Sequence, residues 1–367
     1  MIPHPAWIEV DLRQFRQNLA AVRRRIGKRN FCLPVKANGY GHGLVQIART
    51  AQEEGVDFLG VSCLQEGATL RHAGITMPIL LFGGIHEEQI RPCVDLQLDL
   101  TISSQLKAEL IAEACTQLGK RARVHLKIDT GMNRIGVRTS SAVALYEAVH
   151  KMPSLELVGI YSHLATADNP NHPFANQQIE AFLKLRQEIG AGPYLWHIAN
   201  SGGLCFYPDS YRDLNMVRPG ILAYGYRPDG QPSDEVQPCF TLKSKVSYFK
   251  VVAPGSGISY GHRYVTNKQS RVATLSIGYG DGYRRSLSSR SSALIRGRRY
   301  PVAGTICMDQ LMVDLCNGEA YVGDEAVLIG QQGEEKISLW ELVQLLDSAP
   351  HEVLTMLGER LPRKYLF

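Results

Sequence analysis

A lysine at the end of a short apolar run is the first residue of this sequence that could do covalent chemistry. Lys36 follows the run at 31–35 and precedes a turn that contains Gly39, Gly41 and Gly43. Burial at a strand end lowers the pKa of an amine and makes it a nucleophile that can form an imine. The same pattern also suits a lysine whose amine reaches solvent before a glycine-rich turn, and the lysine alone does not decide between them.

Other polar side chains follow later apolar runs in the same way. A guanidinium at Arg134, in the charged segment 127–136, could neutralise a carboxylate or a phenolate, although a strand end with surface ion pairs would look similar. Ser201 and two glycines follow the run at 195–198 and could open a helix whose free N–H groups bind a phosphate. The remaining polar residues in equivalent places are His163, Asp168, Asn200 and Arg218.

A repeating pattern between about residues 31 and 225 would position these side chains. Helix-like segments such as 142–149 and 177–189 alternate with short apolar runs that have the length of strands. Eight strands alternating with helices predict an α/β fold, a (β/α)8 TIM-like barrel, although a doubly wound sheet would show the same alternation. In a barrel, the carboxyl ends of the strands meet at one face. The eight runs are 31–35, 58–61, 78–82, 96–102, 124–128, 157–161, 195–198 and 214–217.

The pattern changes near residue 230, after the turn-rich segment 227–233. Alternating strands then follow without long helices, and one helix is expected near 339–346. We therefore expect residues 12–230 to form the barrel and residues 231–367 to form a mainly β C-terminal domain. The opening strand, within residues 1–11, is expected to join that second domain. The expected C-terminal strands are 239–252, 270–277, 292–295, 310–313 and 325–329.

Composition and charge disfavour several other classes of protein. Among 367 residues, 40 basic and 35 acidic side chains give a net charge of +5, which is too small an excess to indicate a nucleic-acid partner. The eight cysteines contain no CxxC pair and the histidines no HExxH motif, so we expect no metal site and a reducing, cytoplasmic environment. We also expect no secretory signal and no membrane span, because the apolar runs are too short.

Four blocks of sequence make the chain resemble the bacterial alanine racemases. These enzymes depend on pyridoxal 5'-phosphate (PLP) and have an N-terminal barrel followed by a C-terminal β domain. The similarity extends almost from end to end, and its most specific blocks are VKANGYGHG at 35–43, HIANS at 197–201, ISYG at 258–261 and ICMDQ at 306–310. The resemblance implies interconversion of L-alanine and D-alanine by a homodimer, with D-alanine supply for peptidoglycan or D-alanine catabolism as the biological role.

The resemblance also implies roles for individual residues. Lys36 would carry PLP and act as one of two bases, and Tyr260 of the partner subunit would be the other. Arg218 would hydrogen-bond the pyridine nitrogen of PLP, with His163 beside the ring and in contact with Arg218. The other implied cofactor contacts are Tyr40, Asn200, Ser201, Gly220 and Ile221. Two bases on opposite faces of a planar centre can remove the α-proton from one face and return a proton on the other.

The substrate side of the site is implied in the same way. Arg134 would orient either the side of the site that holds Tyr260 or the substrate carboxylate, and Met308 of the partner subunit would also bind the substrate. Lys127 matches a lysine that is often carbamylated. The substrate entrance would contain Asp168, Tyr279 and Arg285.

Two positions depart from the family pattern. Gly39 stands where many members have alanine, which should change little. Glu359 stands where some members place a tyrosine near the cofactor phosphate, and a carboxylate facing a phosphate would be repelled.

Two alternatives to a strict alanine racemase therefore stay open. A racemase of the same fold could accept serine, lysine or other amino acids. A PLP-binding regulatory protein without turnover is a more remote possibility. Such proteins resemble the barrel alone, and the C-terminal domain with Tyr260 argues against that reading.

Overall fold

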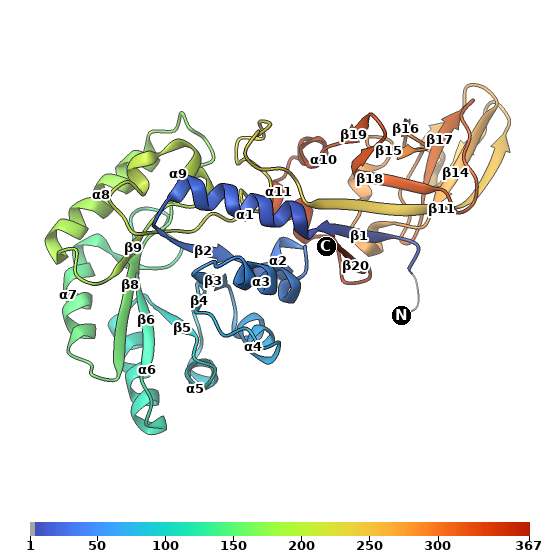
Figure 1. The fold of residues 1–367 in the computed structure, drawn as a ribbon. Helices are drawn as coiled ribbons and strands as arrows, with labels where there is room; N and C mark the ends of the chain where they lie inside the picture. The colour runs from blue at the N-terminus through green and yellow to red at the C-terminus, as the bar shows by residue number, and fades with distance from the viewer. Residues whose placement is uncertain (1–3) are drawn as a thin grey trace. The chain divides into compact units, whose positions relative to one another are not determined.

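The computed structural model describes residues 4–367 (Figure 1). The chain divides into two compact units. One comprises Gln14–Gly39 and Gly43–Pro238, which we call the barrel unit. The other comprises the chain up to Arg13, Tyr40–His42 and Cys239–Phe367, which we call the C-terminal unit.

Eight parallel strands form a near-closed barrel in the barrel unit. Every hydrogen-bonded neighbour along the order β10-β2-β3-β4-β5-β6-β8-β9 is parallel. The order follows the chain and returns to β2 through β10, so the barrel is confirmed and the doubly wound sheet is excluded. The strands are β2 Asn30–Pro34, β3 Phe58–Val61, β4 Ile79–Leu81, β5 Asp99–Ile102, β6 Ala122–Asp129, β8 Leu155–Tyr161, β9 Leu195–His197 and β10 Met216–Val217. A short strand, β7 Val137–Arg138, pairs with β6.

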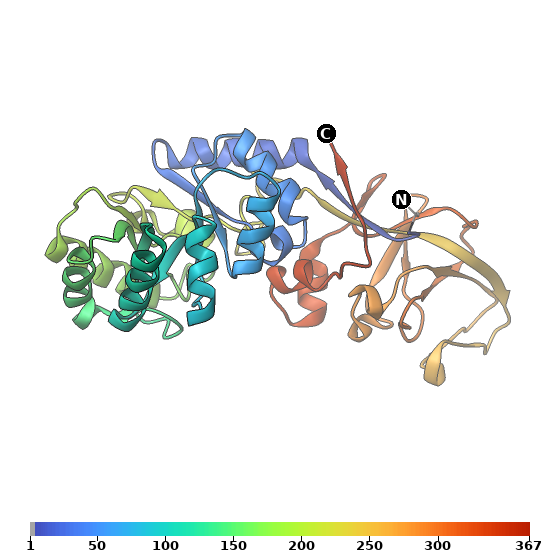
Figure 2. The ribbon, with the colours of Figure 1, turned by 90° about the horizontal axis from the view of Figure 1, so that it is seen from below.

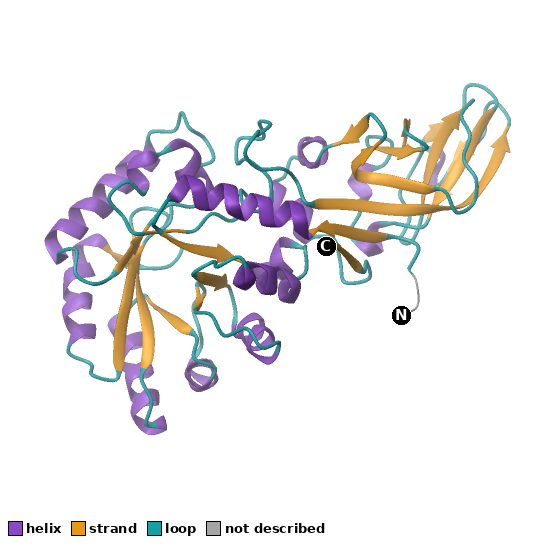
Figure 3. Cartoon of the chain, in the orientation of Figure 1, coloured by secondary structure: helices purple, strands orange, loops and turns teal. Residues whose placement is uncertain are grey.

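Helices cover the outside of this barrel, as the views in Figures 2 and 3 show. The strands are buried between their neighbours and the helices, which is why β3 and β4 are buried at every residue and read as continuous apolar runs. The helices are α1 Leu12–Ile26, α3 Leu44–Glu53, α4 Leu64–His72, α5 Glu87–Asp95, α6 Gln105–Leu118, α7 Thr139–His150, α8 Phe174–Ile189 and α9 Ser201–Phe206. None of the helices within residues 4–367 is long and apolar enough to cross a membrane.

The C-terminal unit is mainly β and is organised around one long strand, β11 Phe240–Val252. Its first half alternates between buried and more exposed residues, as expected of a sheet with two different faces. The opening strand β1 Trp7–Asp11 runs antiparallel to β11 and parallel to β20 Arg363–Leu366. The other strands are β12 Gly257–Ile258, β13 Tyr264–Val265, β14 Ser270–Leu275, β15 Ser292–Ile295, β16 Arg298–Pro301, β17 Leu311–Cys316, β18 Glu325–Gln332 and β19 Glu335–Ile337.

The helix expected near 339–346 is present as α10 Leu339–Leu346, and a second helix, α11 Pro350–Thr355, follows it. Ser338 and Glu341 explain where α10 begins, because they form a capping box in which each side chain accepts from the other's backbone N–H. The short strands β16, β19 and β20 were not expected from the sequence, because their three or four residues show no clear periodicity.

Candidate active site

Lys36 follows β2 at the carboxyl end of that strand. Val35 continues the pairing of β2, since its N–H donates to the carbonyl of Gly60 over 2.8 Å. Burial lowers the pKa of Lys36, the charge of Arg134 lowers it further, and Glu66 opposes both effects. The Lys36 amine is therefore neutral more often than that of an exposed lysine, and this favours the attack on a carbonyl that the sequence suggested.

A left-handed turn fixes the backbone directly after Lys36. Ala37, Asn38, Gly39 and Tyr40 all have φ between 52° and 61°, although only one of them is glycine. Each non-glycine residue there costs about 1–2 kcal/mol, so other contacts must hold the turn. The Gly39 N–H donates to the carbonyl of Val35 (2.7 Å), and Asn38 Oδ1 accepts from the N–H of Leu44 (2.8 Å).

Arg218 follows β10 and is almost completely buried. Its Nη2 donates to the carbonyl of Ser162 (2.6 Å), and its Nη1 donates to the His197 carbonyl (3.1 Å) and to His197 Nδ1 (2.5 Å). His163 Nδ1 lies 3.4 Å from Nη2. Among the described residues, Nε has no acceptor. Burial lowers the pKa of Arg218 to about 10, which still leaves the guanidinium charged near neutral pH.

The loops after β9 and β10 meet at Ser201. Ser201 is the first residue of α9, and its hydroxyl accepts from the N–H of Leu222, the residue after Ile221 (3.2 Å). Asn200 caps α9 through its side-chain oxygen, which accepts from the N–H of Gly203 (2.9 Å). Loops after the last two strands of a barrel are a common place for a phosphate, and here they lie together.

Gly202 is required by the packing of this loop. A Cβ at this position would lie 2.0 Å from the carbonyl oxygen of Ala167. Asp168 follows Ala167 and is exposed.

Positive charge is concentrated around His163. Burial lowers the pKa of His163 well below its ordinary value, and the charges of Lys127, Arg218, Arg134 and Lys36 lower it further, in that order. Among the described residues, the carboxylates that raise the pKa of Lys36 and Lys127 are Glu66 and Asp129, respectively. Cations therefore outnumber anions at the carboxyl end of the barrel, which is the setting that an anionic ligand needs.

Lys127 lies inside the barrel and makes no ion pair with any described residue. Its Nζ is 4.2 Å from the centre of the Tyr161 ring. Burial and the charges of Arg218 and Arg134 hold its pKa well below the ordinary range.

The other predicted site residues lie in the C-terminal unit. Tyr260, Met308 and Tyr279 are 72%, 54% and 41% exposed, and Arg285 is also exposed. Backbone hydrogen bonds from Tyr279 to the carbonyl of Cys307 (3.0 Å) and from Gly280 to that of Met308 (2.8 Å) join two of these loops. Thr305 Oγ1 donates to the carbonyl of Tyr260 (2.9 Å).

The ring of Tyr40 also belongs to this unit and lies 5.4 Å from the ring of His351, measured between centres.

Sequence reasoning missed several polar residues inside the barrel, namely Asp99, His125 and Tyr161. All three lie within strands and are buried. The signal that could have found them is a charged or ionisable residue in a run that should be apolar throughout.

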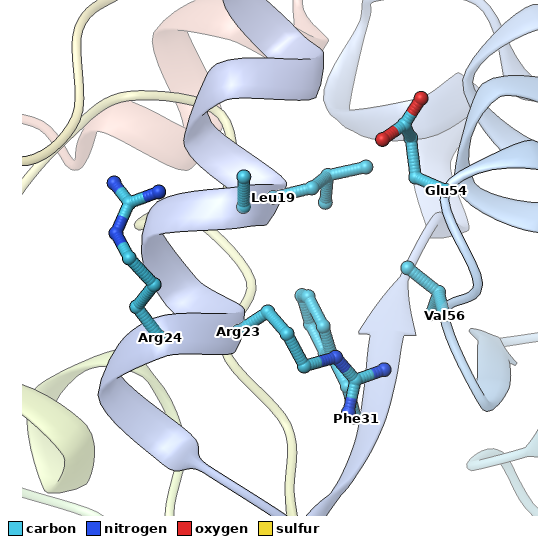
Figure 4. A pocket seen from close by; sticks show the side chains of 7 residues that line it. Leu19, Arg23, Arg24, Phe31, Glu54 and Val56 are labelled. Atoms are coloured by element: carbon cyan, nitrogen blue, oxygen red, sulfur yellow. The ribbon is translucent and has the colours of Figure 1, made fainter.

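A surface pocket of about 310 Å³ lies elsewhere in the barrel unit (Figure 4). Phe31 lines it near the start of β2, whereas Lys36 follows the end of that strand. None of the predicted site residues lines this pocket. Residues 4–367 also contain no group of three or more His, Cys, Asp or Glu side chains that could hold a metal ion.

Comparisons with known proteins decide the family. The model of the alanine racemase N-terminal domain matches residues 10–228, and that of the alanine racemase C-terminal domain matches residues 239–365. The chain belongs to the alanine racemase family. The alanine racemase of Symbiobacterium thermophilum is 40% identical over 367 residues, covering 98% of this chain and 97% of the relative. That of Methanococcus maripaludis is 39% identical over 375 residues, covering 100% of both chains.

Solved alanine racemase structures have the same fold. The enzyme from Clostridium difficile 630 superposes with a TM-score of 0.92 at 35% identity, covering 100% of this chain and 97% of that one. The enzyme from a D-cycloserine-producing Streptomyces lavendulae gives a TM-score of 0.94 at 33% identity, covering 100% and 98%.

Alanine racemases are PLP-dependent, and the residues of this chain fit the cofactor. Lys36 provides an amine of lowered pKa, and the loops at Ser201 and Gly220 can receive a phosphate. Arg218 is almost completely buried and keeps an Nε–H without an acceptor among the described residues, which suits the lone pair of an unprotonated ring nitrogen.

Proposed function

We propose that this protein interconverts L-alanine and D-alanine with PLP, using two bases on opposite faces of the substrate. The observation that carries the proposal is the gathering of Lys36, Lys127, Arg134 and Arg218 around His163 at the carboxyl end of the barrel. Within this group the guanidinium groups of Arg134 and Arg218 supply the positive charge that suits an anionic ligand such as the carboxylate of an amino acid. Relatives named alanine racemase, similar over the full length of the chain, support alanine as the substrate.

PLP, when bound, withdraws electrons from the substrate and acidifies the proton on its α-carbon. The amine of Lys36 would hold the cofactor and take or return this proton on one face of the substrate. Tyr260 of the partner subunit would do so on the other face. Arg218 can only donate, so it would leave the ring nitrogen of the cofactor unprotonated. A weaker electron sink disfavours side reactions such as transamination.

Roles for the remaining residues are proposed from the resemblance to the family. We assign Arg134, with Met308 of the partner subunit, to the substrate carboxylate. We assign Ser201, Gly220, Ile221 and Tyr40 to the phosphate, with Asn200 holding the loop. His163 would lie beside the cofactor ring. Asp168 and the exposed side chains of Tyr279 and Arg285 would line the substrate entrance.

Lys127 is proposed to carry a carbamate. A buried amine with a lowered pKa reacts readily with carbon dioxide, and the resulting anion would balance the charges of Arg134 and Arg218.

A homodimer completes the proposed site. Tyr260, Met308 and Tyr279 are large side chains that their own unit leaves exposed, and burial of such residues is typical of a subunit interface. We also propose that residues 1–11 with 231–367 form one domain and 12–230 the other. A cytoplasmic site of action, with D-alanine supply for peptidoglycan as the role, fits the free cysteines of the described chain.

The test is a racemase assay with PLP against a panel of L-amino acids. Alanine is expected to react fastest. Lys36→Ala should lose activity together with the visible absorption of the bound cofactor, while Lys28→Ala, an exposed lysine beyond the end of α1, should retain both. Full activity in Lys36→Ala would contradict the proposal.

A broader-specificity racemase is the second candidate, and Glu359 is the observation that favours it. The side chain of Glu359 is exposed, so it can adapt to different substrates or face away from them. Comparable rates with serine and alanine in the same panel would support this candidate.

A further inference from the structure

Four buried polar side chains form a line through the barrel from Arg218 to Asp99. Arg218 Nη1 lies 2.5 Å from His197 Nδ1, His197 Nε2 lies 3.3 Å from His125 Nδ1, and His125 Nε2 lies 3.4 Å from Asp99 Oδ2. All four are at most 3% exposed. We call these residues the Asp99–Arg218 chain. His197 ends β9 while Asp99 begins β5, so the line crosses the barrel from its carboxyl end to its amino end.

The donor and acceptor capacities of these four side chains allow only one donor-to-acceptor order for the hydrogen bonds of the Asp99–Arg218 chain. A guanidinium only donates and a carboxylate only accepts, whereas a neutral imidazole has one donor and one acceptor nitrogen. His197 Nδ1 must accept from Arg218, so its proton lies on Nε2. His125 Nδ1 must then accept from His197, so its own proton also lies on Nε2 and is donated to Asp99. This arrangement satisfies all three hydrogen bonds with both imidazoles neutral.

The charge states of the residues at the two ends of the Asp99–Arg218 chain stabilise this donor-to-acceptor order. Arg123 donates to Asp99 from Nε (2.9 Å) and Nη2 (3.1 Å). Burial raises the pKa of Asp99, but hydrogen bonds from His125 and Arg123 outweigh it and hold the pKa below its ordinary value, so the group is an anion. Burial and the charge of Arg218 hold the pKa of His197 well below its ordinary value, so this ring stays neutral.

Packing holds the planes of both rings. The ring of Tyr161 stacks on His197 with centres 4.9 Å apart and an angle of 4° between the planes. The Tyr161 hydroxyl is in turn held by Thr101 Oγ1 at 2.7 Å. Gly159 on β8 makes room for His125, since a Cβ there would lie 2.4 Å from His125 Nδ1. Close packing therefore holds both ring planes, and the hydrogen bonds decide which edge of each ring faces which partner.

We propose that Asp99 and His125 are positioning residues that act on Arg218 through His197. By fixing the acceptor nitrogen of His197, they hold Nη1 of Arg218 and leave its Nε–H free for an acceptor on the ligand. No carboxylate among the described residues contacts Arg218, so Asp99 is the anion to which it is connected through hydrogen bonds. This inference rests on the proposed function, in which that acceptor is the ring nitrogen of PLP.

The first experiment compares Asp99→Asn with the matched control Asp95→Asn, an exposed aspartate paired with Lys120 on the surface. The readout is the tautomer of His197 and His125, measured by ¹⁵N NMR of histidine-labelled holoenzyme. Wild type and the control should show the proton of both rings on Nε2. In Asp99→Asn, His197 should populate the other tautomer, and kcat for alanine should fall about tenfold, with a smaller change in KM.

A pair of variants at His125 separates this role from simple packing. Asparagine and leucine have the same number of side-chain heavy atoms and branch at the same carbon, but asparagine keeps an acceptor near the Nδ1 position. His125→Asn should preserve the His197 tautomer and most of kcat, whereas His125→Leu should lose both. Equal effects of the two variants would overturn the proposal. This pair also decides the matter if Asp99→Asn does not fold.

The outcomes distinguish this inference from the proposed function. Wild-type enzyme that does not racemise alanine would contradict the proposed function. The tautomers of His197 and His125 would still test the donor-to-acceptor order of the Asp99–Arg218 chain. Wild-type activity combined with unchanged tautomers and kcat in Asp99→Asn would overturn the inference alone.

Discussion

The barrel unit buries several of its proposed site residues, whereas those within residues 239–367 of the C-terminal unit are exposed. Lys127, His197 and Arg218 are almost completely enclosed, and burial shifts the pKa of each. Tyr260 is 72% exposed and sits in a turn where Ser259 and His262 have positive φ. The barrel unit thus shifts the pKa values of its groups by burial within a single subunit. The C-terminal unit instead leaves the Tyr260 side chain without neighbours in the described chain that enclose it. The proposed site shared between two subunits would supply those neighbours.

The largest expected effect is the loss of racemase activity in two single variants and its recovery when their subunits are mixed. Lys36→Ala and Tyr260→Phe should each lose about 10²–10⁴-fold in activity, the usual contribution of a general base. When the two variants are unfolded and refolded together, half the dimers are mixed and each contains one intact site. Activity should then recover to about a quarter of wild type, measured as alanine racemisation. No recovery in dimers shown to be mixed would contradict a shared site.

The next effect concerns the phosphate loop of the barrel unit. Gly202→Ala should force the backbone away from Ala167 and lower the free energy of unfolding by about 1–3 kcal/mol. PLP affinity should fall as well, because Ser201 moves with this backbone. Thermal melting and PLP titration would measure the two effects. Gly84→Ala, where the nearest atom to a new Cβ is 3.6 Å away, is the control and should change little.

The buried histidines predict how stability depends on pH. The pKa of His197 is lowered in the folded protein, so below about pH 6.5 only the unfolded chain binds a proton at this position. Stability should therefore fall as pH decreases, by up to about 1.4 kcal/mol per pH unit, and should gain nothing from this group above that range. Melting at about pH 7 and about pH 5.5 would measure this loss. His197→Gln should reduce the loss, and the exposed His150→Gln should leave it unchanged.

The smallest expected effect lies in the C-terminal unit. Arg360 Nη2 donates to Asp309 (2.8 Å) and its Nε lies 3.3 Å from Asp281, which holds the Met308 loop beside the Tyr279 loop. Arg360→Leu should raise KM for alanine by about threefold, and it should also lower the melting temperature, because the Asp281 carboxylate is only 2% exposed and loses its cation. A change in melting without a change in KM would show that Arg360 supports the fold and not the entrance.

Much of the fold could be predicted because local patterns carry it. Strand β15 and helix α10 lie at the expected residues, since alternation and helical periodicity are visible in a single segment. The barrel strands were found within a few residues for the same reason. The left-handed turn after Lys36 was not predictable, because Ala37 and Asn38 prefer other conformations and only their surroundings hold them there.

The sequence by itself determined that Lys36, Ser201 and Arg218 follow parallel strands that alternate with helices and therefore lie at the same edge of the sheet. Order along the chain and the parallel direction of the strands are enough for that conclusion. Only the tertiary structure decided that Asp99, His125, His197 and Arg218 touch in sequence across the barrel interior. They come from four places far apart in the chain, and closing the barrel is the step that brings their side chains within hydrogen-bonding distance.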